Sequence, residues 1–213
     1  MTFTKRQPRS RPETLLKRTE ILKAAADTFG SKGYANGTLA EIAEQVNMTH
    51  AGVLHHFHSK DQLLLEVLRY RDASDVENLD NKHIPDGIDL FRHLVRTAFA
   101  NAQRAGIVQA YVVLSSESVT DDHPAREFFE SRYRTLRAEV VHAFEVMCAE
   151  RGITAPDTIR HASVSILAVM DGLQVQWLLT PDDVDLAHAS EFAIEAIVRA
   201  VVEPRPTSIL AAD

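Results

Sequence analysis

One short stretch, from Thr38 to Lys60 (TLAEIAEQVNMTHAGVLHHFHSK), gathers side chains that could do chemistry at close spacing. Its four histidines, His50, His55, His56 and His58, could ligate a metal or donate hydrogen bonds to nucleic acid. On a helix, however, His55 and His56 point about 100° apart, and no carboxylate or cysteine completes a ligand set at the usual spacing. We therefore favour imidazoles that face DNA, and we expect neither a metal site nor another cofactor.

Two short helices are needed to position these side chains. The periodicity predicts helices at 39–45 and 49–57, joined by a turn through Val46-Asn47-Met48. Thr38 and Glu41 have the spacing of a capping box at the start of the first helix, and Asn47 adopts a left-handed conformation at low cost. Helices this short, joined by so tight a turn, are typical of a helix-turn-helix, whose second helix lies in the DNA major groove.

The second of these helices must bury one face and present the other to the duplex. Val53 and Phe57, four residues apart, supply the buried face. The residues left for DNA are Thr49, which is the expected N-cap, His50, Ala51, Gly52, His55 and His56. The alternative is a pair of short core helices in an unrelated bundle. The capping signals, the turn and a basic flank occur together here, which disfavours that alternative.

Helical periodicity continues along nearly the whole chain, so we expect an all-α fold of about nine helices. A first helix is expected to stop at Gly30 and Gly33, and a fourth to run from about Ser59 to Arg71. Longer helices are predicted at roughly 88–104, 107–118, 124–150, 157–179 and 182–202, the last starting at Thr180-Pro181-Asp182-Asp183. The polar stretch 78–87 predicts a connection between a domain at 13–73 and another at 86–203, with a basic arm at 1–12 and a tail at 204–213.

The composition is that of a globular protein, with 45% hydrophobic and 25% charged residues. A single cysteine, Cys148, cannot form an internal disulfide, which fits a reducing compartment. Since no apolar run approaches about 20 residues, we expect no membrane span and a cytoplasmic protein.

The charge is distributed unevenly along the chain. Residues 1–60 hold nine Lys and Arg against five Asp and Glu, a balance of +4. The whole chain carries −7, which leaves −11 for residues 61–213. This asymmetry indicates nucleic-acid contact at the N-terminal end only. The arm with Lys5, Arg6, Arg9 and Arg11 could enter the minor groove or be a solvated tail, and the sequence leaves both open.

The stretch Thr38 to Lys60, preceded by Phe29-x-x-x-Gly33-Tyr34 and followed by Leu63-Leu64, resembles the DNA-binding domain of the tetracycline-repressor (TetR) family. The resemblance covers about residues 15–70. It implies a transcriptional repressor rather than an enzyme, working as a homodimer on a palindromic operator in double-stranded DNA. It also implies release by a small-molecule effector in the C-terminal domain, and phosphate contacts from Lys60 and the Thr38 end of the second helix. Leu54 replaces a tyrosine that normally touches the DNA backbone, so that contact is not implied.

The C-terminal part offers candidates for the effector pocket, which needs apolar walls with few polar groups. They are Tyr111, Phe128, Tyr133, Met170, Asp171, Gln174 and Trp177. Each of them could instead be ordinary core packing. The alternative function is a helical enzyme acting on a small molecule in such a cavity. We assign no catalytic residues, because no nucleophile, metal set or acid–base pair has a convincing spacing.

The last two predicted helices are apolar on several faces, so they must be buried on several faces. Another subunit could cover them and complete an intermolecular four-helix bundle. The residues predicted for that dimer interface are Ile166, Leu173, Ile194, Ile197 and Val201. A well-buried monomer core is the alternative.

Overall fold

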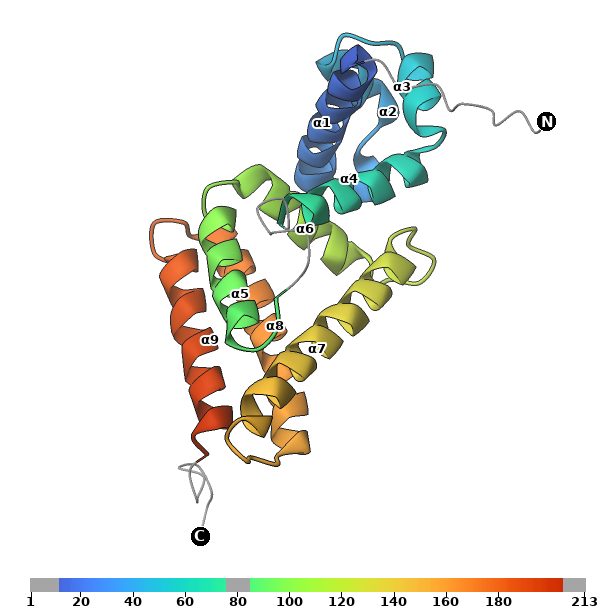
Figure 1. The fold of residues 1–213 in the computed structure, drawn as a ribbon. Helices are drawn as coiled ribbons and strands as arrows, with labels where there is room; N and C mark the ends of the chain where they lie inside the picture. Colours follow the sequence, from blue (N-terminus) through green and yellow to red (C-terminus); the bar gives the residue numbers. More distant parts are fainter. Residues whose placement is uncertain (1–11, 76–84, 205–213) are drawn as a thin grey trace, which may run out of the picture.

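The computed structural model describes residues 12–75 and 85–204, and these residues form nine α-helices and no strand (Figure 1). The helices are α1 (Pro12–Asn36), α2 (Leu39–Gln45), α3 (His50–Phe57), α4 (Lys60–Asp75), α5 (Ile88–Asn101), α6 (Ala105–Glu117), α7 (Arg126–Ala149), α8 (Pro156–Leu179) and α9 (Leu186–Val202). The expected all-α fold of about nine helices is confirmed. The basic arm, most of the predicted connection at 78–87 and nearly all of the tail lie outside the described residues.

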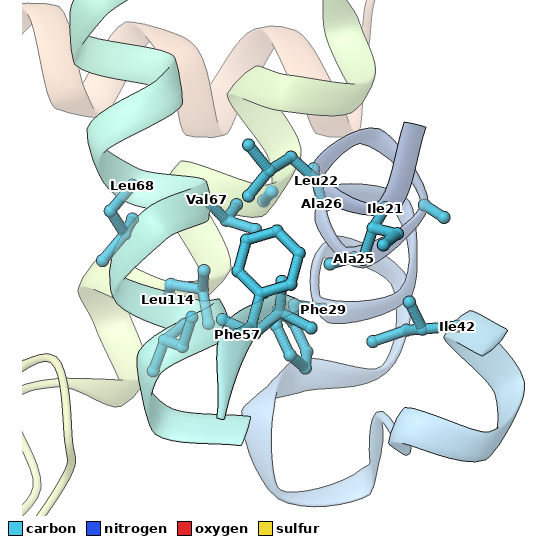
Figure 2. Close-up of a cluster of buried hydrophobic side chains, with 14 of the residues drawn as sticks. Ile21, Leu22, Ala25, Ala26, Phe29, Ile42, Phe57, Val67, Leu68 and Leu114 are labelled. Carbon is cyan, nitrogen blue, oxygen red and sulfur yellow. The ribbon is translucent and has the colours of Figure 1, made fainter. Parts of the chain in front are cut away.

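A single hydrophobic cluster holds α1 to α4 together. Figure 2 shows Phe29 of α1 and Phe57 of α3 in its centre, with Ile42 of α2 and Val67 of α4 beside them. The cluster does not stop at the expected domain boundary, because Leu114 of α6 belongs to it and is fully buried. The four N-terminal helices therefore share a core with the C-terminal part, mainly through the packing of α1 on α6.

Close packing of α1 against α6 explains why Gly30 does not end the first helix. A Cβ atom at position 30 would lie 3.0 Å from the backbone nitrogen of Ala110, so the glycine permits this approach. Gly33 does interrupt the helix, with φ of 74°. The prediction that the first helix stops at both glycines was thus wrong at Gly30, where the glycine serves helix packing.

Four helices of the C-terminal part, α5, α7, α8 and α9, enclose a second hydrophobic cluster. Phe91 and Phe144 both belong to it, with ring centroids 4.6 Å apart. The expected start of the last helix at Thr180-Pro181-Asp182-Asp183 was wrong, since these residues form a turn and α9 begins at Leu186. Asp185 is the N-cap there, because its side chain accepts a hydrogen bond from the His188 backbone nitrogen at 3.1 Å.

One described helix, α8, is long and apolar enough to cross a membrane by length and composition, with a mean hydropathy of 1.4 over its most apolar window. The sequence expectation overlooked it because polar residues interrupt the run. In the fold, α8 packs against α6, α7 and α9. Such contacts on several sides are also those of a core helix in a helical bundle.

Candidate functional site

The predicted capping chemistry fixes both helices of the helix-turn-helix. Thr38 accepts a hydrogen bond from the Glu41 backbone nitrogen at 3.2 Å, and Glu41 accepts one from the Thr38 nitrogen at 3.1 Å. Thr49 caps α3 by accepting from the Gly52 nitrogen at 3.1 Å, and Asn47 has φ of 51° in the turn. These local predictions are confirmed, and each cap typically contributes about 1 kcal/mol.

Two basic residues of α1 hold the C-terminal ends of these helices, a feature that the sequence analysis missed. Lys17 Nζ donates to the carbonyl oxygen of Val46 at 2.8 Å, and Arg18 Nη1 donates to that of His56 at 2.5 Å. The Arg18 guanidinium also lies 4.3 Å from the centre of the Phe57 ring. Cations at helix C-termini complement the negative end of the helix dipole. Lys17 thus fixes α2 to α1 and Arg18 fixes α3 to α1, and neither contact uses the outer face of α3.

The outer face of α3 presents most of the residues predicted for DNA. Thr49, His50, Ala51 and His55 are exposed, as is Thr38 at the start of α2. Gly52 and His56 are half-buried. A Cβ at position 52 would lie 3.0 Å from Met48 Cε, so Gly52 also serves the packing of α3 on the turn. DNA contact by these residues stays a prediction.

Lys60 lies at the start of α4 beside an aromatic ring. Its Nζ is 4.4 Å from the centre of the Tyr34 ring and 3.3 Å from the carbonyl oxygen of Ala35. Burial, together with the hydrogen bond that Tyr34 donates through its hydroxyl to Asp61, raises the pKa of the Tyr34 phenol. The Tyr34 backbone nitrogen donates to Glu117 of α6 at 2.8 Å. The proposed phosphate-binding lysine is thereby linked to the C-terminal part.

A cavity of 850 Å³ lies between α4, α5, α6, α7 and α8. Six of the seven residues predicted for the effector pocket line it: Tyr111, Phe128, Tyr133, Met170, Asp171 and Gln174. Trp177 does not line this cavity. It lies one turn beyond Gln174 and is half-buried elsewhere on α8. The volume is within the usual range for sites that hold a small molecule.

An ion-pair network that the sequence analysis missed forms one end of the cavity. Arg71 is buried and pairs with Asp75 at 3.0 Å and with Asp72 at 3.3 Å. Arg132 of α7 pairs with Asp72 at 2.6 Å, and Arg104 pairs with Asp75. The i,i+4 spacing of Arg71 and Asp75 was a signal for one of these pairs. The network ties the end of α4 to α7 and to the start of α6.

Further polar groups line the cavity away from this network. Tyr133 donates through its hydroxyl to Asp171 at 2.6 Å. Burial raises the pKa of Asp171, although this hydrogen bond and the charges of Arg71 and Arg132 oppose the rise. Burial likewise raises the pKa of Glu139, which also lines the cavity.

Three half-buried or buried histidines predict how stability depends on pH. Burial lowers the pKa of His56, His93 and His123 below the ordinary value of 6.5. Below that value the unfolded chain therefore binds protons that the folded chain does not. We expect these three histidines to lower the free energy of unfolding as the pH drops from about 7 to about 5. In urea titrations, His93→Gln should flatten this slope. The exposed His161→Gln is the control, and an equal effect of both variants would contradict the prediction.

Three of the predicted dimer-interface residues were placed wrongly. Ile166, Ile194 and Val201 are buried in the protomer's own core, because α8 and α9 turn these side chains toward α5 and α7. Leu173 and Ile197 are half-buried. The opposite faces of the two helices carry a different set of apolar side chains that are exposed in the protomer: Val164, Val175 and Leu179 of α8 and Phe192 of α9.

A capped helix-turn-helix beside a cavity in an all-helical body defines a helix-turn-helix DNA-binding protein with a small-molecule site. Residues 21–67 match the family model described as bacterial regulatory proteins, tetR family. Residues 88–202 match the model described as BetI-type transcriptional repressor, C-terminal. The chain therefore belongs to the tetR family of bacterial regulators.

Individual relatives can be aligned with this chain over most of their length. The HTH-type transcriptional regulator TtgR of Pseudomonas putida is 26% identical over 184 residues, which cover 84% of this chain and 88% of that protein. Among solved structures, FadR of Bacillus subtilis with stearoyl-CoA has a TM-score of 0.70 at 15% identity, covering 84% of this chain and 97% of that one. The SmeT–triclosan complex has a TM-score of 0.69 at 17% identity, covering 87% and 91%. These structures share the fold of this chain.

Proposed function

We propose that this protein is a homodimeric repressor in the cytoplasm that binds a two-fold symmetric operator through α3 and leaves it when a small molecule enters the cavity. One observation carries the proposal most directly, namely that a single helix borders both sites. The start of α4 holds Lys60 beside the helix-turn-helix, and its later turns, from Leu65 to Asp75, line the cavity. The structures of SmeT with triclosan and FadR with stearoyl-CoA show ligands bound to proteins of this fold.

The coupling would act through the position of α4. In a dimer, the duplex fixes the distance between the two α3 helices at about 34–36 Å, one helical turn of DNA. A ligand that pushes the cavity end of α4 would move the Lys60 end and change this distance. By linkage, DNA would then weaken ligand binding by the same factor, typically about 5- to 150-fold.

The exposed apolar faces of α8 and α9 support the homodimer. Val164, Val175, Leu179 and Phe192 replace the three buried residues as proposed interface residues, together with Leu173 and Ile197. Apolar side chains gathered on two adjacent helices are typical of a protein–protein contact. An isologous contact of this kind has two-fold symmetry, which the operator must share.

Selection of bound sequences from a pool of random DNA duplexes tests the proposed function. We expect enrichment of an inverted repeat whose half-sites are about one helical turn apart. Enrichment of a sequence without dyad symmetry would contradict the homodimer. No enrichment would contradict sequence-specific DNA binding altogether.

Lys60→Ala should weaken operator binding by a similar factor for every sequence and flatten its dependence on salt. Loss of one phosphate contact lowers the slope of log affinity against log salt by about 0.9. Fluorescence anisotropy of the selected operator at several salt concentrations measures both effects. Arg160→Ala, which removes an exposed charge of α8, is the control. An unchanged slope would remove Lys60 from the phosphate contacts.

A further inference from the structure

The carboxylates of the cavity fall into two groups. Asp72 and Asp75 belong to the ion-pair network with Arg71, Arg104 and Arg132. The negative charge of the two aspartates is more than offset there, because three arginines and two aspartates leave one positive charge. Arg71 also lies over the Tyr111 ring, with its guanidinium carbon 4.2 Å from the ring centre. These arginines are thus held by groups of the protein itself.

The second group lies on α7 and α8. Asp171 accepts a hydrogen bond from Tyr133, and within residues 12–75 and 85–204 neither Asp171 nor Glu139 forms an ion pair. Glu127 also lines the cavity without such a partner in this part of the chain. In total, five carboxylates line the cavity, and so do three arginines, Arg69, Arg71 and Arg132. The net charge of the residues that line the cavity is therefore negative. Each of the three arginines already has a carboxylate partner.

Gln174 adds an independent observation. The residue is 4% exposed and lines the cavity one helical turn after Asp171. Among the described residues, its Oε1 atom has no hydrogen-bond donor within reach. A buried acceptor without a partner is destabilising, so a ligand that donates a hydrogen bond to it would bind more tightly. Asp171 and Gln174, one helical turn apart, therefore place a carboxylate and an amide oxygen that is unpaired within the described part of the chain on the same side of α8.

We propose that the effector of this protein is an amphipathic cation, an apolar molecule with an ammonium group that binds between Asp171 and Gln174. The proposal rests on the proposed function, since it names the ligand class for the same cavity. The ammonium donates to both acceptors, and Glu139 adds to the negative potential. The apolar body lies along Phe128, Leu136 and Leu167, which also line the cavity.

An organic anion fits this cavity less well. It would add a charge where carboxylates outnumber arginines, and it could satisfy neither Gln174 Oε1 nor Asp171. The buried Arg71 Nε also has no acceptor among the described residues, but the Arg71 charge is already shared with Asp72 and Asp75. A neutral ether or carbonyl oxygen on the ligand would be sufficient for that donor.

Three fluorescent probes of equal shape test the proposal: pyrenylbutylamine, pyrenylbutanol and pyrenylbutanoate. They differ only in a positive, neutral or negative end group, and fluorescence titration gives the affinity of each. We expect the amine to bind tightest and the carboxylate weakest. Tighter binding of the carboxylate, or no binding of the amine up to its solubility limit, would overturn the proposal.

Two variants test whether Asp171 and Gln174 bind the ammonium group of the amine. Asp171→Asn keeps the shape and the acceptor for Tyr133, and it should weaken the amine by about 10- to 100-fold, while the alcohol changes by less than about threefold. Gln174→Leu should weaken the amine in the same direction. Asp157→Asn, exposed on the same helix, is the matched control. The alcohol titration reports whether each variant keeps its cavity. An amine affinity that is unchanged in both variants would overturn the proposal.

The same probes separate this inference from the proposed function. If the alcohol or the carboxylate releases the selected operator and the amine does not, the ligand class is wrong and the repressor function stands. If the amine binds through Asp171 and leaves operator affinity unchanged, the ligand class stands and the release function is wrong.

Discussion

Phe192→Glu should convert the protein to a monomer and lower operator affinity by about 100-fold or more. Phe192 is 76% exposed on α9, and α9 packs against α8, whose exposed apolar residues we also assign to the dimer interface. A glutamate on each protomer would bury two unpaired like charges in that contact, which costs several kcal/mol. Two separate monomers must then bind the two half-sites independently. They lose the high effective concentration that the dimer provides for the second half-site, an effect of about 10²- to 10⁴-fold.

Sedimentation velocity measures the first effect and anisotropy of labelled operator the second. The protomer itself should stay folded, because a substitution at an exposed position changes the free energy of unfolding by about 0.5 kcal/mol or less. Val119→Glu is the matched control, since Val119 is also 76% exposed but lies between α6 and α7. A Phe192→Glu dimer that binds operator normally would show that the interface lies elsewhere.

Asp75→Ala should lower the free energy of unfolding by about 3–5 kcal/mol. Asp75 accepts from Arg71 at 3.0 Å and from Arg104, and its side chain is largely buried. Removal of Asp75 leaves the three arginines of this network with Asp72 as its remaining carboxylate, so much of their desolvation is then uncompensated. The same network joins α4 to α6 and α7. We therefore expect that a ligand also releases the operator less effectively from this variant.

Asp157→Ala is the matched control for this prediction. Asp157 pairs with Arg160 at 2.7 Å on the surface of α8, and both side chains are exposed. Exposed pairs contribute about 0–1 kcal/mol, because water screens the charges and both side chains lose freedom. Urea unfolding monitored by circular dichroism compares the two variants. Equal losses of stability would mean that the buried network does not hold α4 in place.

Local chemistry made the helix-turn-helix predictable from sequence. The capping box of Thr38 and Glu41, the N-cap at Thr49 and the left-handed Asn47 depend on residues at most three positions apart. Such interactions form whatever the rest of the chain does, so a sequence pattern is enough to find them. The same argument covers Ser59, whose hydroxyl accepts from the Gln62 nitrogen at 3.0 Å.

Long-range packing decided what the sequence could not. Periodicity identified α8 and α9 as apolar on several faces, but it could not say which face meets the protomer's own core. Ile166, Ile194 and Val201 turned out to be buried against neighbouring helices, which left Phe192 outside. Both faces are apolar in sequence, and only the crossing of helices far apart in the chain distinguishes them.

The features of the cavity can also be divided into those that the sequence predicted and those that only the tertiary structure revealed. The sequence by itself determined an all-helical fold with a helix-turn-helix at residues 38–60, because short-range spacing fixes caps, turns and helical faces. The role of a regulator was implied by the resemblance of that stretch to the TetR family. It also marked six residues that line the cavity. Only the tertiary structure brought Arg71 and Asp75 of α4 against Arg104 and Arg132, and it left Gln174 Oε1 without a partner among the described residues. Such charge balance depends on distances between side chains on different helices, and these distances are set when the helices pack together.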